Sequence, residues 1–307
     1  MNEANQVLGS SRAPTPTVGE PRDVAEAMAA ALRAAGEDAD VDLAGLAGAG
    51  VGSPGAIDAS AGTVTGAANL PGWAGSYPLA SELGQMLETS VVLGNDVTVA
   101  TEAEFQLGAG RPYRSMIGVF CGTGVGGGLI LDGKPWLGRG GAGEFGHMVI
   151  RRGGARCPCG RRGCVEAYAG RGPMELSARR RVRHGSKTLL VKIMDSRGRT
   201  RLASGVFARA LSRRDPLATL LVNRAVRALG AGIGSAVNLL DLEAVIVGGG
   251  LGTRLGQPFV ESVRAATLPH LFLPDRPPAM LLAELGDLGG AIGAALLVGA
   301  ALETAQD

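Results

Sequence analysis

The stretch from Gly118 to Glu166 constrains the fold and chemistry of this chain more than any other. An apolar run at residues 116–120 leads into a glycine-rich segment, and apolar residues resume at 129–131. Two apolar runs separated by glycines predict a strand, a turn and a second strand. Such a turn brings backbone N–H groups close to a phosphate. The candidate anion-binding residues are therefore Gly122, Thr123, Gly124, Gly126, Gly127 and Gly128.

The same stretch contains three of the four cysteines, Cys157, Cys159 and Cys164, and His147 lies ten residues before the first of them. Three thiolates and one imidazole form a closed structural zinc set, and the intervening glycines let a short loop fold around one ion. The alternative is three reduced thiols in a loop. A disulfide is not expected, because nothing else indicates an oxidising compartment. Cys121 lies in the first apolar run, where we expect a small core residue.

Composition describes an ordinary globular chain. Of 307 residues, 46% are hydrophobic and 19% charged, so a sizeable core in two domains is feasible. Glycine, at 50 residues, is over-represented and indicates many specified turns. A net charge of +2 gives no strong attraction to nucleic acid or to a membrane surface. We find no signal peptide and no apolar run of the roughly 20 residues that span a bilayer, so we expect a cytoplasmic protein.

Periodicity and capping residues predict the other elements. Asn95 and Asp96 follow a predicted strand, at a position where α/β sheets place ligand chemistry but where such residues also cap helices. Two arginine-rich stretches, 179–183 and 197–201, are interpreted as solvated surface rather than a nucleic-acid patch, because no aromatics interleave. The expected elements are a strand-like piece at 6–9, a helix at 24–35 capped by Asp23 and ended by Gly36, a strand at 90–94, helices at 97–108 and 216–238, strands at 244–247 and 281–285, and a helix at 288–302.

The motifs together resemble the ROK family (repressors, open reading frames, kinases), and within it the bacterial glucokinases. They are, in order, Asn95-Asp96, the Gly122–Gly128 turn, Gly143–His147, Cys157–Glu166 and an apolar strand ending in Gly248–Gly250. The resemblance runs from about residue 7 to the C-terminus. It implies an α/β fold of two actin-like (ribonuclease H-like) domains with a cleft between them. Residues 1–109, completed by a helix at 289–307, would form the small domain, and 110–288 the large domain.

The resemblance also implies the site. Asp96 matches the base that accepts the proton of the sugar hydroxyl, and Asn95 matches a residue that holds neighbouring hydroxyls. Glu144, His147 and Glu166 match sugar-binding residues. His147 would serve twice, with one ring nitrogen on zinc and the other directed to the sugar.

The nucleotide part of the site follows from the same resemblance. Gly248, Gly249 and Gly250 match glycines that lie against the adenosine of ATP, and Mg²⁺ would arrive with the nucleotide. The implied activity is phosphorylation of a hexose, most naturally glucose at its 6-hydroxyl, by a homodimer. Another hexose, such as an N-acetylated hexosamine, and polyphosphate as donor both suit the same residues.

One family motif, the phosphate loop DxGGTK, does not occur in the printed sequence. We expect it in coding sequence upstream; the alternative is a real loss. The chain as printed would then have a sheet short of two strands, bind sugar and phosphorylate it poorly, so a catalytically silent sugar binder remains an alternative. A ROK transcription factor would need a helix-turn-helix domain of about 60 residues before Val7. A zinc-ribbon nucleic-acid binder fits neither the charge nor the single metal cluster.

Overall fold

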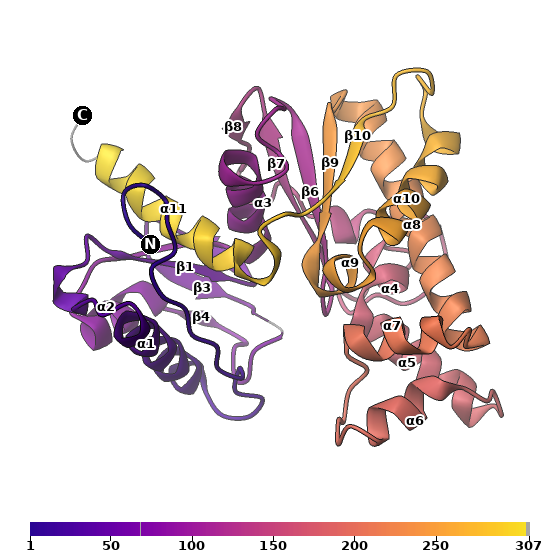
Figure 1. The fold of residues 1–307 in the computed structure, drawn as a ribbon, viewed down its shortest axis with the longest axis horizontal. Coiled ribbons are helices and arrows are strands. Elements are labelled where there is room, and N and C mark those ends of the chain that lie inside the picture. Colours follow the sequence, from indigo (N-terminus) through magenta and orange to yellow (C-terminus); the bar gives the residue numbers. More distant parts are fainter. Residues whose placement is uncertain (68, 305–307) are drawn as a thin grey trace. The chain divides into compact units, whose positions relative to one another are not determined.

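The computed structural model describes residues 1–67 and 69–304 (Figure 1). They form two compact units. The first comprises residues 1–103, 137–141 and the chain from 288 onward, and the second comprises residues 104–136 and 142–287. Both contain sheets and helices, which confirms the predicted α/β class.

The first unit is built on two small sheets. Strands β1 and β5 pair in parallel from Ala49↔Val91 to Ser53↔Asn95, and β2, β3 and β4 form an antiparallel sheet. Its core is centred on Trp73, whose Nε1 donates to the carbonyl of Val64 at 3.0 Å. The elements are α1 (Pro21–Asp38), η1 (Leu43–Gly45), β1 (Ala49–Ser53), β2 (Ala56–Asp58), β3 (Thr63–Thr65), β4 (Ser76–Tyr77), α2 (Leu79–Leu87), β5 (Val91–Asn95), the start of α3 (Asp96–Leu107) and α11 (Gly289–Thr304).

Two predictions in this unit were wrong. Residues 6–9 do not form a strand, because no described strand lies beside them to complete a ladder. Helix α1 begins earlier than predicted: Glu20 is its N-cap and Pro21 takes the first helical position. The carboxylate of Asp23 accepts a hydrogen bond from the backbone N–H of Glu20 at 2.7 Å. Gly36 does not end the helix. It is buried inside it, where a Cβ would lie 2.9 Å from Leu43.

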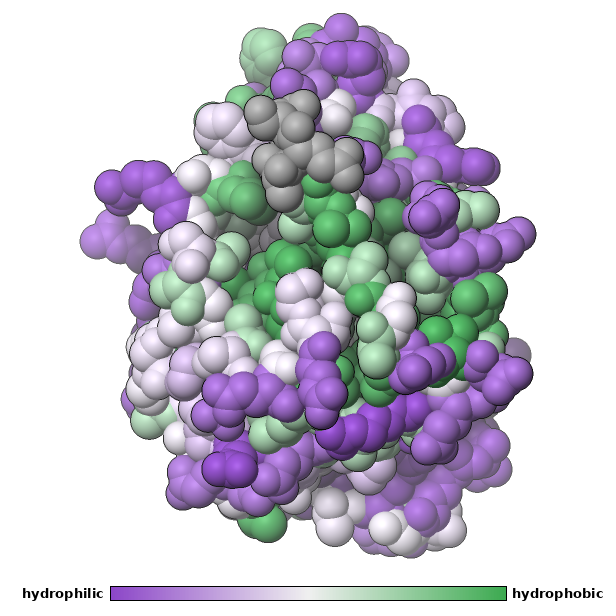
Figure 2. Space-filling model, turned by 90° about the vertical axis from the view of Figure 1, so that its left-hand side faces the viewer, coloured by the Kyte–Doolittle hydropathy of each residue, from purple (hydrophilic) through white to green (hydrophobic). Residues whose placement is uncertain are grey.

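Helix α11 packs on the parallel pair of strands of the first unit. Gly50 of β1 lies against the backbone of Ala294, and Gly293 lies against the carbonyl of Val99, so α11 approaches its neighbours at backbone distance. By length and composition alone the window Gly286–Glu303 is a candidate membrane span, of which 22% is buried. Figure 2, which faces the first unit, shows hydrophobic side chains gathered at the centre of that face.

The second unit is organised around one mixed sheet with strand order β10-β9-β6-β7-β8. Helices α8 and α10 lie together on one side of it (Figure 1). Beyond α3, the elements are β6 (Met116–Cys121), β7 (Val125–Leu131), β8 (Lys134–Pro135), η2 (Phe145–His147), α4 (Glu166–Ala169), α5 (Arg171–Arg183), α6 (Leu189–Asp195), α7 (Ser204–Ser212), α8 (Pro216–Leu240), β9 (Ala244–Gly248), α9 (Gly249–Leu255), α10 (Gln257–Thr267), η3 (Leu268–His270), β10 (Ala279–Leu282) and η4 (Gly286–Leu288).

Strand β9 shows how this sheet is buried on both faces. Val245 and Val247 belong to the large core cluster, whereas Ala244 and Ile246 belong to a smaller cluster with Met116. Alternate residues of a strand point to opposite faces, so a strand covered on both sides is apolar throughout. The strand ends at Gly248, directly before α9, and its burial gives the glycines Gly248–Gly250 a rigid base.

The carboxylate of Glu104 anchors the end of α3 in the second unit. This side chain is only 1% exposed. Its Oε2 accepts from the backbone N–H groups of Ala109 and Glu284, each at 3.1 Å, and its Oε1 accepts from Leu285 at 2.8 Å. Three N–H donors on one carboxylate satisfy a buried charge that would otherwise be costly.

Candidate functional site

The loop with Glu144 and His147 lies directly on strand β7, and glycines make this possible. A Cβ on Gly127 would lie 2.7 Å from the Cβ of Phe145 and 2.8 Å from the carbonyl of Gly143. Gly143 itself has a φ of 81°. Phe145 is buried in the core between the two polar residues. The loop therefore presents Glu144 and His147 from a fixed base, with Glu144 exposed and His147 half-buried.

The imidazole of His147 lies between a thiol and a carboxylate. Its Nδ1 is 3.7 Å from the Sγ of Cys157, and its Nε2 is 3.8 Å from an Oε of Glu144. One ring nitrogen thus belongs to the cysteine cluster and the other is on the Glu144 side.

The three predicted cysteines and His147 come together. Their four ligand atoms all lie within 4.8 Å of one another, and the Sγ atoms of Cys159 and Cys164 are 3.8 Å apart. A tetrahedral zinc site with Zn–S bonds of about 2.3 Å has S···S edges of about 3.8 Å, so the Cys159–Cys164 separation matches such a site. Backbone features shape the cysteine loop. The N–H of Cys157 donates to the carbonyl of Arg161 at 2.8 Å, and Gly160 has a φ of 89°.

The environments of the thiols differ. Burial raises the pKa of Cys157 and of Cys164 above the ordinary value. The hydrogen bond from the Nε of Arg161, at 3.5 Å, lowers the pKa of Cys159 to about 6. Cys121 is fully buried in β6, and burial raises its pKa to about 12. It is a core residue, as predicted, and takes no part in the cluster.

Glu166 joins the cysteine cluster to the glycine hairpin. Its Oε2 accepts from the backbone N–H of Val125 at 2.9 Å, and its Oε1 is 3.6 Å from the Sγ of Cys157. A Cβ on Gly124 would displace this carboxylate, so the glycine allows Glu166 its present position. Glu166 therefore fixes the first residue of β7 relative to the metal-binding loop.

The glycine hairpin is tighter than predicted. The turn consists of Gly122, Thr123 and Gly124, closed by a hydrogen bond from Gly122 N–H to the Gly124 carbonyl at 2.9 Å. Gly126, Gly127 and Gly128 belong to β7 itself and pair with β6. The prediction that the whole glycine run forms the turn was therefore wrong. Within β7, the missing Cβ of Gly127 leaves room for the overlying loop at Gly143 and Phe145.

The second glycine run, Gly248–Gly250, closes against the same hairpin. Gly249 has a φ of 74°, and a Cβ there would lie 2.7 Å from the backbone nitrogen of Cys121. A Cβ on Gly250 would lie 3.3 Å from the Oγ of Ser204. The start of α9 is thus in contact with the end of β6.

Sequence reasoning missed Arg171, the first residue of α5. Its backbone N–H donates to the carbonyl of Gly122 at 3.2 Å, and its guanidinium donates to Thr123 Oγ1 and to Ser204 Oγ, each at 3.1 Å. The pKa of Arg171 is lowered, first by burial and then by Arg201. A half-buried cation held by two neutral hydroxyls at a glycine turn suits an anion. The available signal was one arginine isolated among the small residues at 169–172.

Asn95 and Asp96 lie in the first unit, at the junction of β5 and α3. The Oδ1 of Asn95 accepts from the backbone N–H groups of Val97 and Thr98, at 3.1 and 3.2 Å. Asp96 Oδ1 lies 3.0 Å from the N–H of Val97. Asn95 therefore caps α3 with its oxygen, and its amide Nδ2 makes no hydrogen bond to the rest of the described chain. Both side chains are partly exposed.

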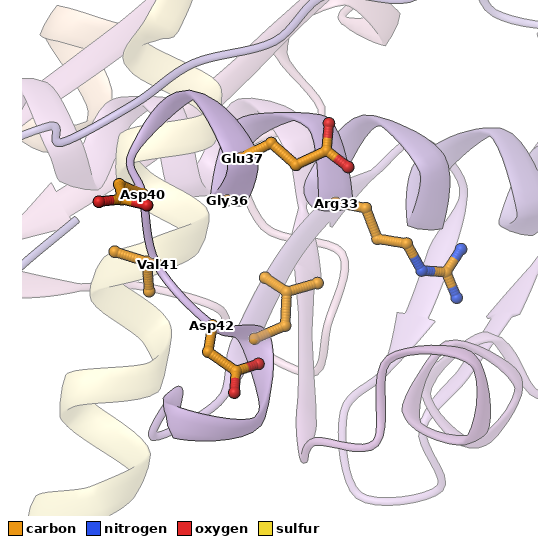
Figure 3. A pocket seen from close by; sticks show the side chains of 7 residues that line it. Arg33, Gly36, Glu37, Asp40, Val41 and Asp42 are labelled. Carbon is orange, nitrogen blue, oxygen red and sulfur yellow. The ribbon is translucent and has the colours of Figure 1, made fainter.

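A pocket of about 710 Å³ in the first unit is lined by none of the predicted site residues. Figure 3 shows Arg33 and Glu37 on α1, with Asp40 and Asp42 on the segment that follows it. A second pocket, of about 650 Å³, lies beside the cysteine loop and includes Cys157.

Comparisons with known proteins identify the family of this chain. A sequence profile of the ROK family matches residues 1–301. A glucokinase of Halalkalibacterium halodurans is 33% identical over 82% of this chain and 76% of its own length. An N-acetyl-D-glucosamine kinase of Shigella boydii is 30% identical over 97% of this chain and 93% of its own. The crystal structure of a ROK family glucokinase from Streptomyces griseus, in complex with glucose and AMPPNP, has a TM-score of 0.82 and 30% identity over 96% of this chain and 93% of that one. The chain belongs to the ROK family and has the α/β fold of that family's kinases, with two actin-like domains.

Proposed function

We propose that this protein is an ATP-dependent hexose kinase that converts glucose to glucose 6-phosphate. The observation that carries the proposal is the continuous set of contacts that joins Glu144, His147 and Glu166 to the cysteine cluster and to the glycine hairpin. A sugar-binding edge and a phosphate-binding turn would thus share one rigid support. Relatives named glucokinases, at 30–34% identity, make glucose the first substrate to test.

Asp96 is the proposed base. Phosphoryl transfer requires alignment and charge stabilisation more than covalent help, and one carboxylate within reach of the attacking hydroxyl supplies the acid–base part. Asn95 uses its oxygen to cap α3, so its amide can donate to a neighbouring sugar hydroxyl. Glu144, His147 and Glu166 would accept from or orient the remaining hydroxyls.

A structural zinc ion is proposed at His147, Cys157, Cys159 and Cys164. The set has the ligand types and separations of a closed tetrahedral site. The ion would hold the loop together and fix the ring of His147 through Nδ1, which leaves Nε2 for the sugar side.

The nucleotide is proposed to bind where Gly122–Gly124 and Gly248–Gly250 meet, with Gly126–Gly128 supporting the turn from β7 and Mg²⁺ bound to the phosphates of ATP. Arg171 belongs to this site. A guanidinium has five N–H donors and the described contacts use two, so it can pair with a phosphate. Charge-assisted hydrogen bonds of this kind are among the stronger ones in proteins.

Three further assignments go with the proposal. The proposed domains are residues 1–109 completed by the C-terminal segment 289–307, of which 305–307 lie outside the described residues, and residues 110–288. The protein works as a homodimer, and it does so in the cytoplasm, where its substrates are found.

A kinase for an N-acetylated hexosamine is the second candidate. It is favoured by the N-acetyl-D-glucosamine kinase of Shigella boydii and by an N-acetylgalactosamine kinase of a Shewanella species, which is 34% identical over 81% of this chain. The same hydroxyl-binding residues suit both substrate classes.

The test is a coupled kinase assay over glucose, mannose, fructose, N-acetylglucosamine and N-acetylgalactosamine, with ATP and with polyphosphate as donors. We expect the highest kcat/KM for glucose with ATP. Binding of glucose and of ADP is measured separately by calorimetry. Sugar binding without nucleotide binding would point to a silent sugar binder, and a preference for an N-acetylated sugar would favour the second candidate.

A further inference from the structure

The pocket beside the cysteine loop is lined by positive charge. Its walls come from the loop at 155–162, from α4 and α5, and from α8, and its volume is about 650 Å³. That is within the range of small-molecule sites. Among its described lining residues there is no carboxylate. Five arginines line it: Arg156, Arg162, Arg180, Arg183 and Arg224.

These arginines are not neutralised by the protein. None of the five side chains makes an ion pair with another residue in the described part of the chain. The pKa of Arg224 is lowered, first by burial and then by the positive charge of Arg181, followed by that of Arg180 and Arg151. The whole chain has a net charge of only +2, so this concentration of cations is local. Like charges held together repel one another, and a bound anion would relieve that repulsion.

One unsatisfied polar atom lines the pocket, and a second belongs to Arg181, the neighbour of the lining residue Arg180. The Oγ of Ser177, which lines the pocket, and the Nε of Arg181 are buried and have no hydrogen-bond partner within the described residues. Buried polar groups are normally paired, so orphaned donors beside a basic pocket indicate a missing acceptor.

One cation of the pocket is preorganised. The guanidinium of Arg224 lies 5.6 Å from the ring centroid of Tyr168, and the hydroxyl of Tyr168 accepts from the N–H of Ala155 at 2.9 Å. The hydrogen bond fixes the ring, and the cation–π contact orients the guanidinium. Arg224 is therefore held in place before any ligand arrives.

We propose that this pocket binds a small, multiply phosphorylated anion, at a site separate from the glycine hairpin. Arginine suits phosphate because its planar fork donates two parallel hydrogen bonds. A concave pocket fits a compact ligand better than a polynucleotide. Single-stranded nucleic acid also uses exposed aromatic stacking platforms, whereas the one aromatic residue here, Tyr168, is 9% exposed.

The test is calorimetric titration of the full-length, zinc-containing protein with inorganic tripolyphosphate at about 150 mM salt, where surface electrostatics is screened over about 8 Å. We expect one-to-one binding that weakens at least about tenfold in R180Q/R183Q, whose side chains lie on the exposed face of α5. R209Q, an exposed arginine on α7, is the matched control. R171M, at the hairpin, should leave this binding intact. Kinase turnover should not change in R180Q/R183Q.

Four results would overturn the proposal. They are an absence of binding, equal binding by wild type and R180Q/R183Q, loss of binding in R171M instead, and binding of an RNA oligonucleotide through these arginines without binding of tripolyphosphate. Sedimentation velocity adds a fifth: if R180Q/R183Q dissociates a dimer and leaves anion binding unchanged, the arginines belong to a subunit interface.

Discussion

The two units supply their site residues in different ways. In the first, Asn95 and Asp96 are positioned locally, because the cap of α3 involves residues at most three positions apart. In the second, Glu166 and Arg171 are fixed by partners far along the chain: Glu166 by Val125, and Arg171 by Thr123 and Ser204. A substitution at a locally positioned residue should therefore lower activity without lowering the stability of the fold. A substitution at a residue held by long-range contacts should lower activity and stability together.

The largest effect is expected for Asp96→Asn. The variant keeps the Oδ1 that faces Val97 N–H but cannot accept a proton, so kcat should fall by about 10²–10⁴-fold with glucose affinity nearly unchanged. Kinase assays and glucose titration measure the two quantities. Asp58→Asn, at the exposed end of β2 in the same unit, is the control and should behave like wild type. Retention of most turnover in Asp96→Asn would mean that the base lies elsewhere.

Cys159→Ala tests whether, in the second unit, stability and sugar binding are lost together. Removing one of four ligands should release zinc and lower the melting temperature, and glucose affinity should fall because His147 loses its fixed ring. Elemental analysis, thermal melting and glucose titration report the three effects. Cys121→Ala is the control: it leaves a small cavity in β6 but should keep one zinc per chain.

A zinc-free Cys159→Ala protein with wild-type stability and glucose affinity would show that the cluster does not support the site.

Arg171→Met should weaken ADP binding by about 10–100-fold, corresponding to loss of charge-assisted hydrogen bonds of about 1.5–3 kcal/mol. Adenosine has no phosphate, so its affinity should not change. Arg171→Lys should recover part of the loss, and Arg209→Met serves as a surface control. Calorimetry with both ligands makes the distinction. Equal weakening of ADP and adenosine would show that Arg171 merely packs the hairpin against α7.

The elements with strong periodicity could be predicted from the sequence. The hairpin at β6–β7, the strand β9 and the long helix α8 lie where expected, because each depends on its own pattern of apolar residues. The cysteine cluster also came together, since ligand types and spacing carry its information locally. The start of α1 was misplaced, because Glu20 as a cap and Pro21 at the first position outweigh Asp23.

Contacts between residues far apart in the sequence could not be predicted, because the sequence patterns are local. The glycines of β7 look like a phosphate turn in the sequence, yet Gly127 is required by the loop at Gly143, sixteen residues later. The role of Arg171 depends on Ser204, which no spacing rule connects to it. The arginine pocket likewise needs α5 and α8 to converge, so Arg180 and Arg183 were interpreted as solvated surface.

The smallest effect is expected at Asn95, and two substitutions separate its two roles. Asn95→Asp keeps an oxygen that can cap α3 but loses the amide proposed to hold a sugar hydroxyl. Asn95→Ala loses both. Glucose affinity should therefore fall in both variants, whereas only Asn95→Ala should lose about 1 kcal/mol of unfolding free energy, the usual value of a helix cap. Denaturant unfolding and glucose titration give the two readouts. If Asn95→Asp binds glucose like wild type, the amide is not a sugar ligand, and the role of Asn95 is only to cap α3.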